Sequence, residues 1–177
     1  MKVFVAGATG VLGRPTVRAV VEAGHEVRGT VRGAEKAEML RSLGAEPVEV
    51  DLFDADALRS TVEGSEAVLH FATKIPPITR MRWKGSWREN DRLRTLASRH
   101  LVDAAIAAEA QIFVYESITF IYGEHGDDWI GEDGSLSISW ASLKSTLDAE
   151  REAKRFTDSG GRGIALRYAG FYALYAQ

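Results

Sequence analysis

Three glycines spaced three residues apart, Gly7, Gly10 and Gly13, directly follow an apolar run from Val3 to Ala6. A segment compatible with a helix comes next, from Val11 to Ala23. In this setting the first glycine permits a tight turn, the second lets the backbone approach a pyrophosphate, and the third lets the helix pack closely on the strand. The helix N-terminus offers free N–H groups and a partial positive charge to phosphates. The stretch therefore predicts dinucleotide binding, with an ordinary strand–helix turn as the alternative.

The residue at the end of the second expected strand bears on the choice of dinucleotide. A site for NAD usually has an Asp or Glu there, which accepts a hydrogen bond from the ribose 2′-hydroxyl. This sequence has Arg32 instead, with Lys36 one helical turn further on. Because a guanidinium suits a phosphate, the sequence favours NADP, and NAD is the less expected cofactor. The alternative is a solvated surface arginine.

Two further strand ends provide candidate cofactor contacts, because sheets of this kind bind ligands at the carboxyl ends of their strands. Asp51 could accept a hydrogen bond from the adenine amino group, with Leu52 against the ring. Asp51 could equally cap a helix. The next strand is followed by the segment Phe71, Ala72 and Thr73. Taken as a whole, this segment is small and polar enough for its backbone to contact the cofactor ribose.

The overall composition fits one globular domain over residues 1–177, with 45% hydrophobic and 27% charged residues. The net charge of −3 argues against a general nucleic-acid binder. The chain has no cysteine, which excludes disulfides and cysteine-based metal sites or nucleophiles. The acidic loop from Gly123 to Gly134 lacks the spacing of an EF-hand, so no metal site is expected. No apolar run reaches the ~20 residues of a membrane span and no secretory signal is visible, so we expect a cytoplasmic protein without a membrane partner.

Expected strands and helices alternate along the chain, which indicates an α/β fold with a doubly wound parallel sheet of the Rossmann type. Right-handed crossovers favour the strand order 3-2-1-4-5-6. The expected strands are Lys2–Ala6, His25–Val31, Pro47–Val50, Ala67–Ala72, Gln111–Ser117 and Gly163–Tyr168. The expected helices are Val11–Ala23, Ala34–Leu43, Asp54–Val62, Trp87–Ala108 and Ser139–Asp158.

With these motifs the sequence resembles the extended and atypical short-chain dehydrogenase/reductases, the NAD(P)-dependent epimerase/dehydratase family. The resemblance covers essentially the whole chain. It rests on Gly7-Ala-Thr-Gly10-Val-Leu-Gly13, Asp51-Leu52, His70-Phe-Ala-Thr73, Leu101-Val-Asp-Ala-Ala105, Val114-Tyr-Glu-Ser117 running to Tyr122-Gly123, and Leu166-Arg167. It implies NAD(P) at the carboxyl edge of the sheet, a triad of Ser/Thr, Tyr and Lys, a small-molecule substrate, and often a homodimer through the two long helices.

The resemblance also assigns roles to single residues. Lys144 matches the family's lysine, which holds the nicotinamide ribose; the alternative is a solvated lysine on a helix. The cofactor-binding residues expected from motif and resemblance together are Gly7, Thr9, Gly10, Val11, Leu12, Gly13, Arg32, Asp51, Leu52, Phe71, Ala72, Thr73, Lys144 and Tyr168.

The sequence departs from the family pattern where catalysis would occur. Four residues before Lys144, where the family has its catalytic tyrosine, stands Trp140, whose indole N–H cannot usefully transfer a proton. The family's Ser/Thr position falls on Ile118, next to Ser117. The remaining catalytic candidates are Lys144, Ser117 and Tyr122. Ser117 could polarise the substrate or be a strand-end serine bonded to the backbone, and Tyr122 could donate the proton or be an aromatic anchor.

The chain ends at Gln177, just after the sixth strand, whereas family members continue with a substrate-binding lobe. We therefore expect that lobe to be missing. The function that these observations favour is an NADP-dependent oxidoreductase or epimerase/dehydratase-like enzyme acting on a small carbonyl, hydroxyl or sugar-type substrate. The alternative is a non-catalytic NADP-binding sensor or regulatory module.

Overall fold

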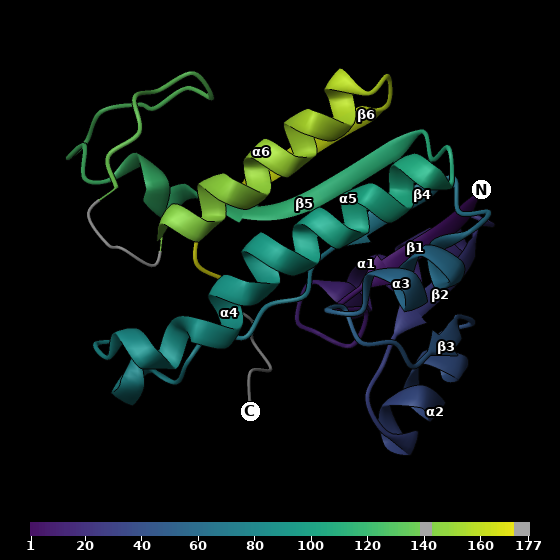
Figure 1. Cartoon of the computed structure of the whole chain (residues 1–177). Helices are drawn as coiled ribbons and strands as arrows, with labels where there is room; N and C mark the ends of the chain where they lie inside the picture. Colours follow the sequence, from purple (N-terminus) through teal and green to yellow (C-terminus); the bar gives the residue numbers. More distant parts are fainter. Residues whose placement is uncertain (139–142, 172–177) are drawn as a thin grey trace.

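A sheet of six parallel strands forms the centre of the computed structural model, which describes residues 1–138 and 143–171 (Figure 1). The strands are β1 (Lys2–Ala6), β2 (Glu26–Thr30), β3 (Glu46–Val48), β4 (Ala67–His70), β5 (Ile112–Ile118) and β6 (Arg162–Tyr168). Their order across the sheet is β3-β2-β1-β4-β5-β6. The predicted doubly wound fold and strand order are confirmed.

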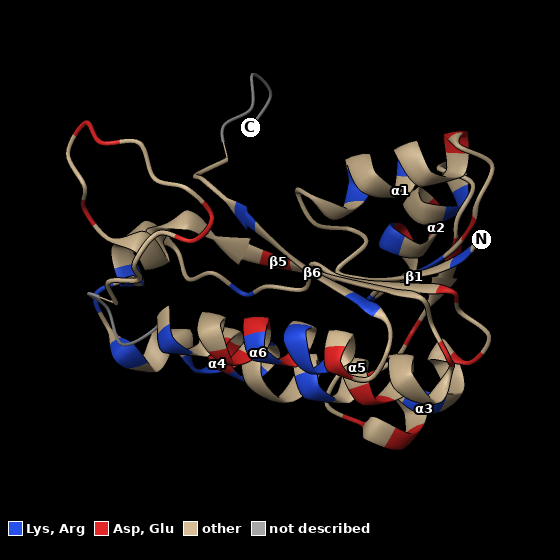
Figure 2. Ribbon diagram, turned by 90° about the horizontal axis from the view of Figure 1, so that it is seen from above, with Lys and Arg blue, Asp and Glu red and all other residues tan. Residues whose placement is uncertain are grey.

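Helices cover both faces of the sheet, as Figure 2 shows: α1 and α2 lie on one side, and α3 to α6 on the other. Their bounds are α1 (Gly13–Glu22), α2 (Ala34–Ser42), α3 (Ala55–Val62), α4 (Arg88–Arg92), α5 (Ser98–Ala107) and α6 (Lys144–Asp158). Short 3₁₀ turns are η1 (Ile78–Arg80), η2 (Lys84–Trp87) and η4 (Thr119–Tyr122), and η3 (Leu93–Ala97) is a π-helical turn. None of the described helices is long and apolar enough to cross a bilayer.

The two helix layers bury alternate residues of the central strands. In β1, Val3 and Val5 pack with Val17 and Leu40 of α1 and α2. On the opposite face, Phe4 joins a cluster to which α3, α5 and α6 contribute. Both faces of β1 are thus apolar, as in a parallel sheet covered on both sides.

The predicted long helix from Trp87 to Ala108 is present but not regular. It consists of α4, the π-helical turn η3 and α5 in direct succession. A π turn inserts residues relative to the α-helical repeat and rotates the side chains that follow. Arg94, the second residue of η3, lies in the interior and is only 2% exposed.

Several boundaries differ from the predicted ones by a few residues. The first helix begins at Gly13, because Val11 and Leu12 belong to the turn that precedes it. The fourth strand ends at His70, after which the N–H of Phe71 still donates to the carbonyl of Ala6 at 2.8 Å. The start of the predicted helix Ser139–Asp158 lies outside the described residues, and the described part begins at Lys144.

Candidate functional site

A cleft of about 1000 Å³ runs along the carboxyl edge of the sheet. The loops that follow the first four strands line it, together with residues of η3 and β5. The predicted cofactor-binding residues that line this cleft are Gly7, Thr9, Gly10, Val11, Leu12, Arg32, Asp51, Leu52, Phe71, Ala72 and Thr73. Residues that the sequence assigned to one ligand therefore meet in one cavity.

The turn after β1 is held by contacts that leave no room for larger residues. Gly7 has a φ of +83°, and a Cβ there would lie 2.6 Å from backbone atoms of Phe71 and Ala72. Its N–H donates to Oγ1 of Thr30 at 2.9 Å, and its carbonyl accepts the N–H of Gly10 at 3.0 Å. Glycine at position 7 is thus required by both the backbone conformation and the approach of β4.

The start of α1 is built to receive an anion. A Cβ on Gly13 would lie 2.2 Å from the carbonyl oxygen of Gly7, so this glycine allows the helix to sit directly on the turn. No acceptor among the described residues takes the N–H groups of Val11 and Leu12. Unpaired N–H groups at a helix N-terminus are the usual donors to a phosphate group. The turn therefore fits a dinucleotide pyrophosphate.

Alanine at Gly13 should mainly lower the stability of the fold, whereas alanine at Gly10 should mainly weaken cofactor binding. Gly13→Ala should lower the free energy of unfolding by about 3 kcal/mol, because the new methyl group meets fixed backbone. Gly10→Ala should cost less than about 1 kcal/mol, because its nearest contact would be the Gly7 carbonyl at 3.3 Å. It should nevertheless weaken dinucleotide binding about tenfold or more, because the methyl group points to the predicted phosphate site. Urea unfolding and a cofactor titration on both variants measure the two effects, and equal loss of stability in both would contradict the assignment.

The far end of the cleft, at the ends of β2 and β3, carries charges of both signs. Arg32 and Lys36 are exposed and form no ion pair or hydrogen bond with any described residue. The carboxylate of Glu49, by contrast, accepts the N–H of Gly33 at 3.3 Å. Two unengaged cations are thus available to a ligand at this end.

Asp51 lines the cleft, and its carboxylate accepts the N–H of Phe53 at 2.9 Å. The residue that caps α3 is Asp54, which accepts the N–H of Ala57 at 3.0 Å. Of the two roles that the sequence left open for Asp51, helix capping therefore belongs to Asp54, and the adenine contact stays a prediction.

Two of the predicted catalytic residues lie away from the cleft. Ser117 is fully buried and donates to a carboxylate oxygen of Glu150 at 2.5 Å. The hydroxyl of Tyr122 donates to the carbonyl of Glu132 at 3.2 Å and accepts from Arg167 at 2.6 Å. Neither residue lines the cleft. Their hydrogen bonds serve the packing of β5, β6 and α6 in this arrangement.

The other residues taken from the family pattern are also not gathered at the cleft wall. Lys144 is the exposed first residue of α6, and Tyr168 ends β6 with its ring 5.3 Å from that of Phe171. Trp140 lies outside the described residues. Their proposed roles stay predictions, because the described part of the cleft is formed without them.

Sequence reasoning missed two buried charged residues at the cleft, Glu116 and Arg94. Glu116, near the end of β5, lines the cleft although it is only 7% exposed. Arg94 on η3 is buried, and its Nε has no partner among the described residues. Burial raises the pKa of Glu116 to about 7, and the positive charge of Arg94 opposes that rise. The available signal was the carboxylate itself, which is the charged residue of the strand Ile112–Ile118.

His70 ends β4 and is fully enclosed between the sheet and η3. Its Nε2–H donates to the carbonyl of Leu93 at 3.2 Å. Burial lowers its pKa to about 4; the hydrogen bond to Leu93 opposes this shift, and the positive charge of Arg94 adds to it. His70 is therefore a neutral structural residue at physiological pH.

Comparison with known families agrees with this geometry. Residues 7–161 match the family model described as NAD(P)H-binding, which covers most of the chain. The chain belongs to this NAD(P)H-binding family. A short-chain dehydrogenase/reductase superfamily protein from Agrobacterium tumefaciens, solved with bound NAD, matches 94% of the chain with 28% identity and a TM-score of 0.75. The predicted resemblance to this superfamily and the predicted NAD(P) cofactor class are confirmed.

Two curated relatives illustrate the range of the family. The 3-diazoavenalumate denitrifying reductase of a Streptomyces species is 35% identical over 180 residues, which cover 97% of this chain and 57% of that protein. The photosystem II assembly factor Ycf39 of Cyanophora paradoxa is 30% identical over 122 residues, covering 67% of this chain and 34% of that protein. The chain thus spans about half the length, or less, of the relatives that it matches.

Proposed function

We propose that the chain is an NADP-dependent oxidoreductase that reduces a small carbonyl-type substrate. The observation that carries the proposal is the single cleft that joins the glycine turn to Arg32 and Lys36. An epimerase or dehydratase reaction on a sugar-type substrate is the nearest enzymatic alternative. Reduction is favoured because the relative that matches 97% of this chain is named a reductase.

The residues of the cleft have separable roles in this proposal. The N–H groups of Val11 and Leu12 donate to the pyrophosphate, which Gly10 allows to come close. Leu52 and Phe53 pack beside the adenine, and Ala72 and Thr73 line the path toward β5. When bound, a reduced nicotinamide supplies a hydride to the substrate.

The preference for NADP depends on Arg32. A charge-assisted hydrogen bond to the 2′-phosphate contributes about 1.5–3 kcal/mol. Arg32→Ala should therefore weaken NADP binding about 10- to 100-fold and leave NAD binding almost unchanged. Fluorescence titration of the parent and the variant with both cofactors measures this.

Two further variants sharpen the cofactor experiment. Arg41→Ala removes an arginine from α2, the helix that follows Arg32, but its guanidinium pairs with Glu38 at 3.2 Å outside the cleft, so NADP binding should not change. Glu49→Gln removes a negative charge from the 2′ end and should strengthen NADP binding. Equal affinity of the parent for NAD and NADP would refute the proposed preference.

A non-catalytic NADP-binding module is the second candidate, and two observations favour it. Ser117 and Tyr122 are held in hydrogen bonds away from the cleft, and a relative is named an assembly factor. Measuring NADPH oxidation in the presence of a panel of aldehydes, ketones and quinones distinguishes the oxidoreductase from the non-catalytic module. Tight NADPH binding without oxidation by any member of the panel would favour the module.

A further inference from the structure

The buried carboxyl group of Glu116 is acted on by the charge of Arg94 but accepts no hydrogen bond from any described residue. Its side chain lines the cleft, yet the residue is more than nine-tenths buried, and no described residue gives it a hydrogen bond or an ion pair. A buried polar group without a partner destabilises the fold, and an isolated charge does so more strongly. Such groups are concentrated at sites where a ligand supplies the missing partner.

The position of Glu116 along the cleft identifies the part of the ligand that it meets. Arg32 marks the 2′-phosphate end at β2, and the glycine turn after β1 marks the pyrophosphate. The same cleft continues across β4 to its other end, where Leu93, Glu116 and Phe171 line it. A dinucleotide lying in this direction places its nicotinamide half, and any substrate beside it, next to Glu116.

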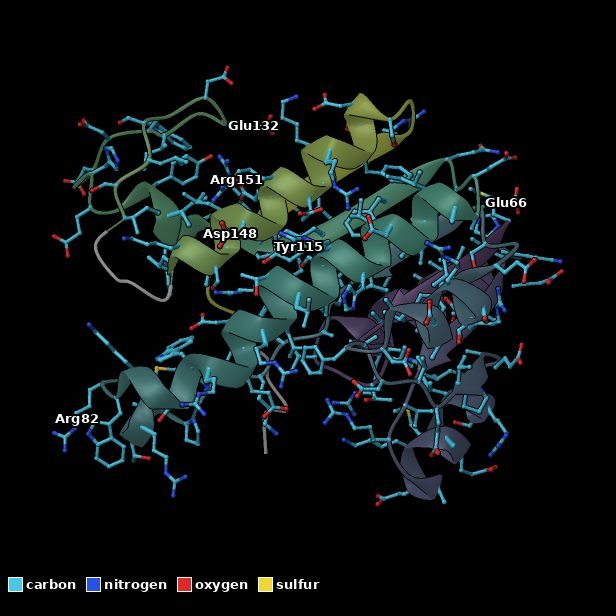
Figure 3. The ribbon with its side chains drawn as sticks, viewed as in Figure 1. Glu66, Arg82, Tyr115, Glu132, Asp148 and Arg151 are labelled. Atoms are coloured by element: carbon cyan, nitrogen blue, oxygen red, sulfur yellow. The ribbon has the colours of Figure 1, made fainter. Side chains whose placement is uncertain are left out.

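The surroundings of this carboxyl allow it both to hold and to release a proton. Arg94 on η3 is the buried cation that favours the carboxylate, while burial favours the acid, so that the pKa is about 7. The phenols of Tyr115 on β5 and Tyr168 on β6 are the other titratable groups close enough for Glu116 to raise their pKa values. Figure 3 labels Tyr115, which packs against η3, α5 and α6 in the core behind the cleft.

Charged side chains also face Glu116 across the open cleft. Lys74, after β4, and Glu89, on α4, both line the cavity and are exposed. Exposed charges are screened by water and salt, so Arg94 acts more strongly on Glu116 than either of them. Glu89 offers a matched control, because it is a second carboxylate of the same cleft without the burial.

We propose that Glu116 is the proton donor of the reductive step, in the role that the family pattern gives to a tyrosine. This rests on the proposed function. The O–H bond of the Glu116 acid breaks as a new O–H bond forms on the substrate oxygen. The carbonyl π bond is lost, and the carbonyl carbon forms a C–H bond with the hydride of the reduced nicotinamide, which is the reductant and is oxidised. The Glu116 carboxylate then regains a proton from water.

The test compares Glu116→Gln with Glu89→Gln. NADPH binding should stay within about twofold of the parent in both variants, which also shows that both fold. The kcat for NADPH oxidation by a responsive carbonyl compound should fall about 10²–10⁴-fold in Glu116→Gln only. In the parent, the rate should decline as the pH rises through about 7, and this limb should disappear in Glu116→Gln.

A second readout does not depend on turnover. In protein with ¹³C-labelled glutamate carboxyls, one resonance should titrate near pH 7 in the parent and in Glu89→Gln, and should be missing in Glu116→Gln. An ordinary carboxyl titration for Glu116, or an unchanged rate and pH profile in Glu116→Gln, would overturn the proton-donor role alone. A parent that binds NADPH but reduces no member of the panel would overturn the proposed function, and this role with it.

Discussion

Between pH 4.5 and pH 8, Glu116→Gln should gain about 3 kcal/mol of unfolding free energy relative to the parent. Folding raises the pKa of Glu116 from its ordinary value of 4.5 to about 7, so below pH 4.5 the side chain is protonated in both states and has no effect. As the pH rises from 4.5 to 7, the unfolded chain ionises first, and each unit costs the parent about 1.4 kcal/mol. Above pH 7 the full cost is present, and glutamine removes it.

Urea denaturation of both proteins at four pH values measures this effect. Placing the glutamine amide in the cleft has a free-energy cost that is the same at every pH. The test therefore uses only how the difference in unfolding free energy between Glu116→Gln and the parent changes with pH. Glu89→Gln keeps the Glu116 carboxyl, so its stability should follow pH as that of the parent does. A stability difference between Glu116→Gln and the parent that does not vary with pH would contradict a buried carboxyl whose pKa is raised in the folded protein.

The same urea denaturation experiment should also reveal the pH-dependent contribution of His70 to stability. Its pKa falls from 6.5 in the unfolded chain to about 4 in the folded one, so its stabilising contribution is present above pH 6.5 and is lost as the pH falls toward 4. In the parent this loss is offset by the gain from protonating Glu116 over the same range. In Glu116→Gln the offset is absent, so the stability of the variant should fall more steeply with acid than that of the parent.

If both predictions about Glu116 hold, the parent carries a destabilising carboxyl that it needs for activity. Glu116→Gln would then be more stable than the parent above pH 7 and less active. Such a trade between stability and activity is characteristic of groups retained for function. A structural carboxylate would show the reverse, because its removal would lower stability.

The sequence was sufficient to predict the parts of the site that the backbone forms. The spacing of Gly7, Gly10 and Gly13 defines a turn whose geometry depends on the absence of side chains, so it can be recognised without tertiary information. The strand order follows from alternating elements and the handedness of their crossovers. The cleft lies where the strands end, and most of the predicted cofactor residues line it for that reason.

The sequence was not sufficient to predict the parts of the site that side chains form. Arg94 is buried on a π-helical turn, and the apolar pattern of a regular helix reveals neither the turn nor the buried arginine. Ser117 and Glu116 are neighbours on a strand, so their side chains point to opposite faces, and only one of them can face the cleft. The family motif drew attention to Ser117, whereas the fold exposes Glu116 to the cleft.

A network of side chains around Glu150 fixes Ser117 and Tyr122 in their positions. The Glu150 carboxylate, on α6, accepts from Ser117 at 2.5 Å and from Arg167 at 2.8 and 2.9 Å. Arg167 on β6 also donates to Tyr122 and to the carbonyl of Glu132, whose loop position Figure 3 labels. The hydrogen bonds to Glu150 raise the pKa of Arg167 above its ordinary value. The side chain of Glu150 is 13% exposed and that of Arg167 24% exposed, so water replaces neither partner well.

Glu150→Gln should therefore lower the free energy of unfolding by about 3 kcal/mol, because Arg167 keeps a largely buried charge without its counterion. Asp148→Asn is the matched control on the same helix: Asp148 pairs with Arg151 at the surface, both are labelled in Figure 3, and its loss should cost less than about 1 kcal/mol. Urea denaturation at pH 7.5 compares the two variants. The kcat of the folded fraction of Glu150→Gln should stay near that of the parent, because the network organises packing and Glu116 carries the proton. A fall in kcat as large as that of Glu116→Gln, with little loss of stability, would instead return Ser117 or Tyr122 to the catalytic machinery.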